Sequence, residues 1–341
     1  MADPGSGNSV GRAVVSGATG FIGRRLVTAL RRQGTEVTVL VRDPGKVEAL
    51  WTDGEVRRYR VDFSLGTDIG AVCEDANTVF HLAGYAHAED ANDDTASALH
   101  RTVTVNGTQA LLSEAERAGV QRFVFVSSVK AMGEGSDRCL DENSAVAPTT
   151  AYGRAKHEAE ELVLETGART GIHVAVLRLP LVYGSGSNGN LPRMIEAIDQ
   201  GRFPPLPENH NKRSMVHVDD VVRALLIAVE NPRANGEVYL VTDGRAYSTY
   251  EICALIRRAL GKSEPKWNVP IGVLRAAAGL GDAISGIRGR PFFFNSVTLN
   301  KLIGSAWYSS ENVQRDLGFR PTHTLETALP EMVEDYRRRA G

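Results

Sequence analysis

The sequence predicts an α/β fold, a doubly wound Rossmann sheet of parallel strands with a smaller, mostly helical C-terminal lobe. Apolar runs alternate with amphipathic helical patterns through the first half of the chain, and a glycine-spaced turn joins the first run to the first helix. After residue 179 this rhythm gives way to loops rich in glycine, serine and proline. Alternating strands and helices are typical of βαβ units, whose right-handed crossovers build a parallel sheet covered on both faces.

The expected strands are short runs, and the one at residues 37–41 is the richest in β-branched residues. Such runs occur at residues 13–16, 37–41, 55–61, 78–82, 122–126 and 173–179. Helical periodicity lies between them, and its longest stretches cover residues 95–118 and 151–170. One further strand–helix–strand unit is expected at residues 214–218, 219–230 and 237–241.

The chain is expected to divide into three parts. Residues 1–10 carry no apolar run and predict a flexible tail. Residues 11–179 together with 214–245 predict a dinucleotide-binding Rossmann domain. Residues 180–213 together with 246–341 predict the second lobe, whose helical patterns are broken by prolines and glycines.

Composition and charge argue against a nucleic-acid-binding, membrane-bound or disulfide-rich protein. The 341 residues are 42% hydrophobic and carry a net charge of −2, so neither nucleic acid nor a membrane is expected as a partner. The cysteines Cys73, Cys139 and Cys253 lack metal-type or disulfide-type spacing and fit a reducing cytoplasm. The apolar stretch 271–280 is interrupted by Arg275 and is too short to span a bilayer. We expect a soluble cytoplasmic protein without a metal.

The glycines Gly17, Gly20 and Gly23 have the spacing of a dinucleotide-binding turn and lie between the first strand and the first helix. In that arrangement the first glycine permits the tight turn, the second lets the backbone approach a pyrophosphate, and the third lets helix pack on strand. The phosphates would bind at the helix N-terminus, where free N–H groups and the helix dipole favour anions. The alternative is a glycine-rich turn that binds nothing.

The end of the second strand bears on which dinucleotide is bound. An acidic residue there suits the ribose hydroxyls of NAD, whereas arginine suits the 2′-phosphate of NADP. Arg42 follows the strand directly, and Asp43-Pro44 looks like the start of a helix. The sequence therefore favours NADP(H) and leaves NAD(H) open, since Asp43 could still reach the ribose. Alternatively, Arg42 is a solvated surface charge.

Tyr152 and Lys156 are spaced one helical turn apart. The pKa of a free phenol is about 10, so a tyrosine that exchanges protons near neutral pH needs a neighbouring positive charge. A lysine at i+4 supplies that charge. The pair alone also fits an ordinary amphipathic helix. Together with the dinucleotide-type turn upstream, it predicts an enzyme that transfers hydride.

Several stretches carry a resemblance to a known family, at residues 16–23, 81–84, 126–128 and 152–156. From about residue 12 to residue 336, the sequence resembles the extended short-chain dehydrogenase/reductases of the nucleotide-sugar epimerase/dehydratase family. Residues 127–134, 177–184 and 211–220 are similar to UDP-glucose 4-epimerase-like proteins and to UDP-4-keto-6-deoxy-N-acetylhexosamine reductases. The resemblance implies a lobe that binds a nucleotide sugar and a homodimer formed through the helices at residues 95–118 and 151–170.

The resemblance also implies catalytic and cofactor-binding roles. Tyr152 would be the acid/base, Ser128 would hydrogen-bond the reacting oxygen, and Lys156 would hold the cofactor ribose and tune the phenol. Asp62 and Phe63 would flank the adenine. Tyr152 and Lys156 would bind the cofactor together with Gly17, Thr19, Gly20, Phe21, Ile22, Gly23, Arg42, Leu82, Ala83, Gly84 and Thr104. Ser128 has an alternative role as a strand-end serine that satisfies backbone groups.

For the substrate, the resemblance implies that Arg213 grips a diphosphate and Asn190 contacts the nucleotide. His87 and Lys130 match polar positions close to the sugar, although bystander roles are equally expected for both. Arg213 beside Lys212 could also be a solvated basic pair.

The sequence departs from the family pattern in three places. Thr104 stands where the family has asparagine, and Leu179 stands where many 4-epimerases have asparagine. A second diphosphate-binding arginine is expected shortly before Trp307, yet residues 296–306 contain only Lys301 as a basic residue.

The expected function is NAD(P)-dependent hydride transfer at C4 of a nucleotide-activated hexose, as a 4-ketoreductase or a 4-epimerase. Two alternatives stay open. One is a reductase of a flat hydrophobic ketone of the steroid or flavonoid type. The other is a non-catalytic Rossmann module that senses NADP, although such modules commonly lose the Tyr/Lys pair.

Overall fold

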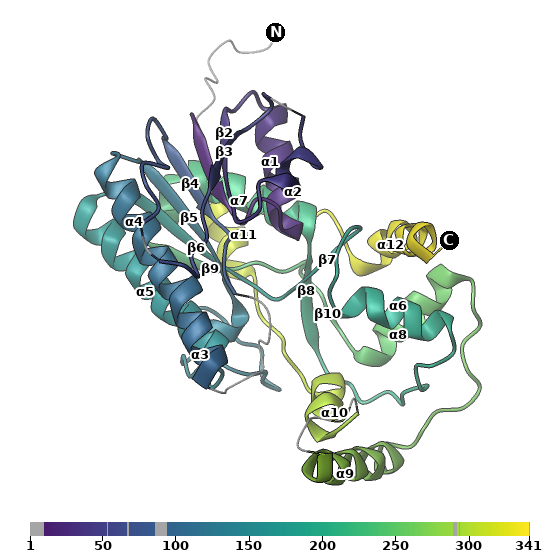
Figure 1. Cartoon of the computed structure of the whole chain (residues 1–341). Coiled ribbons are helices and arrows are strands. Elements are labelled where there is room, and N and C mark those ends of the chain that lie inside the picture. The colour runs from purple at the N-terminus through teal and green to yellow at the C-terminus, as the bar shows by residue number, and fades with distance from the viewer. Residues whose placement is uncertain are drawn as a thin grey trace.

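Parallel strands form the centre of the molecule, which confirms the predicted doubly wound sheet. The computed structural model describes residues 10–52, 54–66, 68–85, 94–288, 292 and 294–340. The order of the seven-stranded sheet is β3-β2-β1-β4-β5-β6-β9, and neighbouring strands are parallel (Figure 1). The strands are β1 (Ala13–Ser16), β2 (Val37–Val41), β3 (Arg57–Arg60), β4 (Thr78–His81), β5 (Arg122–Ser128), β6 (His173–Leu179) and β9 (Glu237–Leu240). The strand order reverses beside β1, where such sheets bind ligands at the carboxyl ends of the strands.

Helices cover both faces of this sheet (Figure 1). On one face, α1, α7 and α11 bury apolar side chains such as Leu26, Leu225 and Val313, and on the other α4 and α5 bury Leu111 and Val163. The helices that accompany the sheet are α1 (Phe21–Arg32), α2 (Gly45–Glu48), α3 (Asp94–His100), α4 (Gly107–Arg117), α5 (Ala151–Thr170), α7 (Val218–Glu230) and α11 (Glu311–Leu317).

Residue types explain which strands lie inside the sheet. β1 is Ala-Val-Val-Ser and is buried along its whole length, as expected for a central strand covered on both faces. β3 is Arg-Arg-Tyr-Arg and is exposed along its whole length at the edge of the sheet. Charged side chains at an edge oppose pairing with another chain.

The smaller lobe combines a three-stranded sheet, in the order β10-β8-β7, with several helices (Figure 1). Its main core contains Tyr183, Ile195 and Leu329, and a separate cluster around Leu274 and Leu299 joins α9 to α10. The elements are β7 (Leu181–Tyr183), β8 (Arg213–His217), β10 (Ala246–Tyr247), α6 (Asn190–Asp199), α8 (Thr249–Leu260), α9 (Ile271–Arg288), α10 (Ser296–Ile303) and α12 (Leu325–Ala340). None of the described helices has both the length and the apolar character that a bilayer crossing requires.

The structure differs from the predicted division of the chain in three places. The sequence assigns residues 214–245 to the large sheet, but β8 pairs with β7 and β10 in the small one, although its Val216 packs in the core of the Rossmann unit with α7 and β9. The sequence places α11 in the lobe, but Val313 and Leu317 belong to the core of the large sheet. Val10, assigned to the tail, is buried, and its carbonyl accepts a hydrogen bond from Thr78. Residues 1–9 lie outside the described residues.

The helix predicted at residues 95–118 is continuous but not uniform. A π-helical segment, Arg101–Asn106, separates α3 from α4. Such wider turns inside α-helices often occur at functional sites. Here the segment carries the buried Thr104, one of the predicted cofactor-binding residues.

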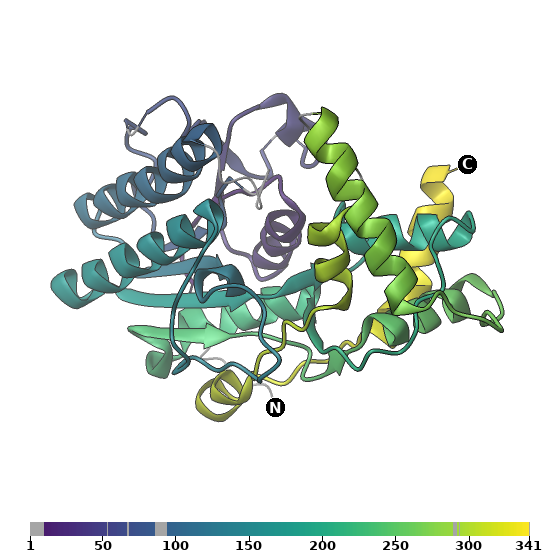
Figure 2. The same ribbon diagram turned by 90° about the horizontal axis from the view of Figure 1, so that it is seen from below.

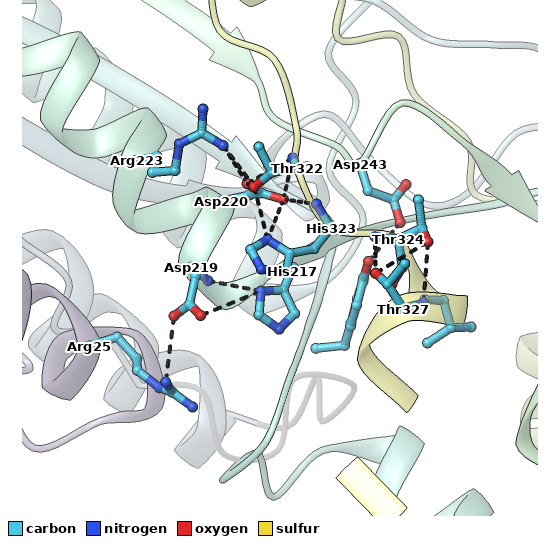
Figure 3. Close-up of polar contacts among 12 residues, drawn as sticks. Arg25, His217, Asp219, Asp220, Arg223, Asp243, Thr322, His323, Thr324 and Thr327 are labelled. Carbon is cyan, nitrogen blue, oxygen red and sulfur yellow. Dashed lines mark hydrogen bonds and ion pairs between the residues drawn. The ribbon is translucent and has the colours of Figure 1, made fainter. Parts of the chain in front are cut away.

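Asp220 fastens the C-terminal segment to the start of α7. Its buried carboxylate accepts hydrogen bonds from the backbone N–H of Thr322 (3.1 Å) and His323 (2.9 Å) and from the Thr322 hydroxyl (2.8 Å). Arg223 adds an ion pair of 2.9 Å (Figure 3). Burial opposes ionisation, but the hydrogen bonds from Thr322 and His323 lower the pKa of Asp220 overall.

Beside Asp220, the rings of His217 and His323 stack with their centroids 4.1 Å apart and their planes at 23° (Figure 3). With Asp219 they bring three potential metal ligands within 4.8 Å of one another. Lone pairs in nearly parallel rings do not converge on one point, and the cluster lies at the positive N-terminal end of α7. Arg25, 3.7 Å from Asp219, adds further positive charge. Geometry and charge therefore disfavour a metal ion at this position.

We expect Asp220→Ala to lower the free energy of unfolding by about 3 kcal/mol, because it leaves the N–H groups of Thr322 and His323 without their charged acceptor. Asp219→Ala, whose carboxylate is partly exposed, is the matched control. Urea denaturation measures both. Since the folded-state pKa of Asp220 is lowered, its contribution is present at neutral pH and is lost as the pH falls through that pKa. Equal denaturation midpoints for wild type and Asp220→Ala at neutral pH would contradict this account.

Candidate active site

The glycine turn between β1 and α1 leaves no room for side chains. Gly17 has φ +68°, and a Cβ there would lie 2.8 Å from the backbone nitrogen of Ala83. A Cβ on Gly23 would lie 2.2 Å from the carbonyl oxygen of Gly17, so only glycine lets α1 pack this closely on the turn. The amide of Gly20 donates to the same Gly17 carbonyl at 3.0 Å and closes the turn.

The N-terminus of α1 is suited to a phosphate group. Gly20 precedes the helix without any side-chain cap, and the first turn contains no acidic residue. Arg24 lies in that first turn, and its Nε is buried with no hydrogen-bond partner among the described residues. Free N–H groups, the helix dipole and the unpaired Nε–H of Arg24 favour an anion together. The turn therefore fits the pyrophosphate of a dinucleotide, and the predicted residues Thr19, Phe21 and Ile22 lie partly exposed around it.

A buried histidine fixes the hydrogen bonds beneath this turn. His81 contacts Ser16 Oγ through Nδ1 (2.6 Å) and Thr108 Oγ through Nε2 (2.9 Å). The Thr108 hydroxyl donates to the carbonyl of Thr104, so it accepts from His81 Nε2–H, and Nδ1 accepts from Ser16. Burial, followed by the positive charge of Lys156, lowers the pKa of His81 to about 3. His81 is therefore a neutral link between β1, β4 and α4.

Ser16 holds the backbone at the end of β4 in place through hydrogen bonds. Its hydroxyl oxygen accepts from the backbone N–H groups of Leu82 and Ala83, each at 3.1 Å. These residues and Gly84, all half-buried, form the segment that lies against Gly17. Residues 82–84, which are predicted to line the cofactor site, are thus held in place by hydrogen bonds and do not form a free loop.

Ser128 and Tyr152 are carried on segments in close contact. Ser128 ends β5, and its Oγ accepts from the backbone N–H of Lys130 at 3.2 Å. Tyr152 lies in the first turn of α5, where Thr150 caps the helix by accepting from the backbone N–H of Gly153. A Cβ on Gly153 would lie 2.4 Å from the carbonyl oxygen of Lys130. The two segments can approach this closely because Gly153 has no side chain.

Lys156 is buried one turn further along α5. Its Nζ donates to the carbonyl of Val126 at 2.9 Å and lies 4.6 Å from the centroid of the Phe125 ring. A Cβ on Gly84 would lie 3.2 Å from that Nζ. The ammonium group is therefore enclosed by β5 and the strand end after β4, which is where the sequence places the cofactor.

A row of aromatic rings runs from Tyr152 through His100 to Tyr85. The ring of His100 lies 5.6 Å from that of Tyr152 and 5.0 Å from that of Tyr85. His100 is the last residue of α3 and is buried. The aromatic row bounds the side of the site that faces α3.

A buried ion pair holds α5 against the sheet behind the site. Glu160 continues the series of Tyr152 and Lys156 at the next i+4 position, and Arg178 on β6 donates to both its carboxylate oxygens, at 2.7 to 3.2 Å. Ser127, next to Ser128, donates a short hydrogen bond to Glu160. Burial alone would raise the pKa of Glu160, but hydrogen bonds from His157 and Arg178 lower it overall. Glu160 therefore ties α5 to β5 and β6.

The predicted adenine side is more exposed. Arg42 is exposed at the end of β2, and the carboxylate of Asp43 accepts from the N–H of Gly45 at the start of α2. Hydrogen bonds from Ser64, which outweigh partial burial, lower the pKa of Asp62. Phe63 is buried, with its ring 6.0 Å from that of His81, so its side chain is part of the core.

The predicted substrate residues are less closely grouped. The guanidinium of Arg213, at the start of β8, donates to the backbone carbonyls of Lys301 (2.6 Å) and Gly304 (3.1 Å) near the end of α10, and burial lowers its pKa. Lys130 forms an ion pair with Glu134, and Asn190 is exposed at the start of α6. His87 lies outside the described residues.

A doubly wound sheet with a glycine turn beside its switch point defines a Rossmann-type dinucleotide-binding protein. The chain belongs to the NAD dependent epimerase/dehydratase family, whose model matches residues 13–242.

Among its relatives, a UDP-glucose 4-epimerase of Vibrio cholerae is 28% identical over 95% of this chain and 94% of its own. A 3-beta-hydroxysteroid dehydrogenase of Mycolicibacterium neoaurum is 27% identical over 98% of this chain and 94% of its own. Among solved structures, MoeE5 in complex with UDP-glucose and NAD is 26% identical, with a TM-score of 0.75 and coverage of 97% and 100% of the two chains.

Sequence reasoning assigned no role to several residues that shape this site. Glu160 had a usable signal, since it lies four residues after Lys156 on the same helical face. Arg178 is a charged residue inside an apolar strand, which also indicates a buried partner. Nothing in the sequence pattern marks the pairing of Ser16 and Thr108 with His81, because it joins positions 65 and 27 residues apart.

We expect Arg178→Met to lower the free energy of unfolding by about 3–5 kcal/mol, because it leaves the buried carboxylate of Glu160 without its partner. The double variant Glu160→Leu/Arg178→Met removes both charges and should recover most of that loss. Urea denaturation of both variants and of Glu160→Leu measures the coupling. If the double variant lost the sum of both single losses, the two side chains would not act as a pair.

We expect Arg24→Met to act in opposite directions on stability and on cofactor binding. Removing a buried, unsatisfied donor should leave the stability of the cofactor-free protein equal or higher. Losing a charge-assisted contact to phosphate should weaken NAD(P)(H) binding by about tenfold or more. Thermal unfolding without cofactor and fluorescence titration with it measure the two effects, and Arg32→Met, exposed on the same helix, is the control. Unchanged cofactor affinity would exclude a contact with phosphate.

Proposed function

We propose that this chain catalyses NAD(P)-dependent hydride transfer at C4 of a nucleotide-activated hexose, with a UDP-sugar as substrate. It would act as a 4-ketoreductase or a 4-epimerase. The observation that carries the proposal is the contact at Gly153, which holds the segments of Tyr152 and Ser128 together while Lys156 is enclosed on the next turn. The full-length similarity to a UDP-glucose 4-epimerase supports this choice of substrate.

In this proposal the three side chains divide the work at the reacting oxygen. A nicotinamide ring, when bound, would accept or donate the hydride. Tyr152 gives a proton to the oxygen as a ketone becomes an alcohol, and it takes the proton back in the reverse direction. Ser128 donates a hydrogen bond to the negative charge that develops on the same oxygen. The positive charge of Lys156 favours the phenolate form of Tyr152.

The cofactor is proposed to be NADP(H), with NAD(H) as the alternative that the family name favours. Arg42 is exposed at the end of β2, where a 2′-phosphate would need a cation. The carboxylate of Asp43 accepts from the N–H of Gly45 at the start of α2, which reduces its capacity to bind ribose hydroxyls. Leu82, Ala83, Gly84 and Thr104 complete the proposed cofactor site.

The substrate is proposed to bind between the Rossmann domain and the smaller lobe, with Arg213 and Asn190 on the lobe side and Lys130 and His87 near the sugar.

We further propose a cytoplasmic homodimer that forms through the helices at residues 95–118 and 151–170.

A second candidate is a dehydrogenase or reductase of a flat apolar substrate. The specific observation in its favour is that Arg213 already donates to two backbone carbonyls, which reduces its capacity to hold a diphosphate. The similarity to a 3-beta-hydroxysteroid dehydrogenase over 98% of the chain points in the same direction.

The test is an assay with purified protein, UDP-glucose or UDP-N-acetylglucosamine, and no added cofactor, followed by an assay of a UDP-4-keto sugar with NADPH. We expect C4 epimers or NADPH consumption, and we expect Tyr152→Phe to lower kcat by about 10²- to 10⁴-fold. Tyr85→Phe, on the neighbouring aromatic row, is the control. Turnover of steroid alcohols with no turnover or binding of any UDP-sugar would replace the proposal with the second candidate. Equal turnover by Tyr152→Phe would reject the assigned acid/base.

A further inference from the structure

Helix α9 is more apolar than its position on the surface explains. Its 18 residues, Ile271–Arg288, include only Arg275, Asp282 and Arg288 as charged residues. A helix that is apolar on all sides is normally buried on all sides. α9 therefore has the composition of a helix with more than one partner.

In the part of the chain that the structure describes, one face of α9 is covered and the others are exposed. Leu274, Ala278 and Gly281 are buried, and a Cβ on Gly281 would lie 1.9 Å from the carbonyl oxygen of Phe294. α9 is the outermost helix of this part of the lobe, and it lies in front of α10 in Figure 2. The apolar side chains on the rest of the helix face no other described element.

The uncovered apolar residues form a stripe along the helix. Val273 and Leu280 are seven residues apart, on the same side of the helix, and are 56% and 68% exposed. Ala276, Ala277 and Ala283 are exposed beside them. Trp267, just before the helix, is 64% exposed. Four of the nine large hydrophobic residues described as exposed lie between Trp267 and Val297, so the exposure is concentrated here rather than scattered.

The charge of this segment is opposite to that of the whole chain. Residues 261–291 contain five basic and two acidic residues, and the ion pair of Lys262 with Asp199 still leaves an excess of cations, although the chain as a whole has a net charge of −2. Lys266 and Arg275 are exposed beside the stripe. Apolar side chains, an exposed tryptophan and flanking cations are the combination with which a helix lies on an anionic bilayer surface.

We propose that α9, with Trp267 at its start, is a peripheral docking surface for an anionic lipid bilayer. The occupant is a membrane rather than a second copy of the chain, because a two-fold contact through the stripe would set the same cationic segment against itself. The net charge of the whole chain gives no indication of this surface, because the excess of cations is confined to one segment. α9 lies on the bilayer and does not cross it.

The docking surface connects to the candidate site through α10. α9 packs on α10 through Leu274 and Leu299, and carbonyls at the end of α10 hold the guanidinium of Arg213. Lipid binding at α9 therefore places the substrate lobe, rather than the Rossmann domain, against the bilayer.

The test is co-sedimentation of the full chain with vesicles of phosphatidylcholine alone or with one third phosphatidylglycerol. We expect wild type to sediment with the anionic vesicles, less so at raised salt and little with the neutral ones. Val273→Asp/Leu280→Asp should lower the partition coefficient about tenfold or more. Leu65→Asp/Val146→Asp, which adds the same charge at exposed apolar loop positions elsewhere, should leave it unchanged.

Thermal unfolding and size-exclusion chromatography accompany each variant, so that a folding defect is distinguished from a binding defect. Wild type that stays in solution with anionic vesicles would overturn the proposal. Equal sedimentation of wild type and the α9 variant would overturn it as well. A wild-type dimer that the α9 variant dissociates would also overturn it and would assign the stripe to contact between copies.

Discussion

Helix α5 can bring Tyr152 to the end of β5 only because Gly153 leaves room for the carbonyl of Lys130, 2.4 Å from where a Cβ would lie. The positions of the next two functional side chains on α5 depend on that approach. It enforces the register that puts Lys156 beneath the strand end and Glu160 against β6. A helix displaced by the width of one methyl group would separate Tyr152 from Ser128, and the proposed mechanism needs both side chains at one reacting oxygen.

When α5 lies this close to the sheet, the charged side chains of Glu160 and Lys156 are buried. Each of them has polar or aromatic partners in the protein. Arg178 forms a salt bridge with both carboxylate oxygens of Glu160. Lys156 donates to a carbonyl and lies over an aromatic ring. His81, close to Lys156, stays neutral because burial and that positive charge lower its pKa to about 3. The ammonium group of Lys156 therefore brings a buried positive charge to the strand end. A buried cation acts more strongly on nearby protons than an exposed one does, because it is less screened by solvent.

The sequence predicts the sheet well because its strands are short apolar runs with clear ends. β1, β2 and β6 occupy the expected residues, and α5 does too. The prediction fails where local pattern cannot specify a partner. β8 has the same apolar pattern as a strand of the large sheet, but Ala246 and Leu181 pair with it in the small one. The buried links of His81 and Arg178 were missed for the same reason, since they join distant positions.

The loop after β7 joins the two parts of the molecule physically. Arg25 on α1 donates to the carbonyl of Ser185, and the backbone N–H of Gly186 donates to Asp335 on α12. α1 also carries the proposed phosphate site, and α12 packs in the core of the smaller lobe. Because both contacts fall on adjacent residues, a shift of α1 must be taken up by the loop or passed on to α12. The residue pair 185–186 thus links α1, which carries the proposed phosphate site, to α12 of the smaller lobe.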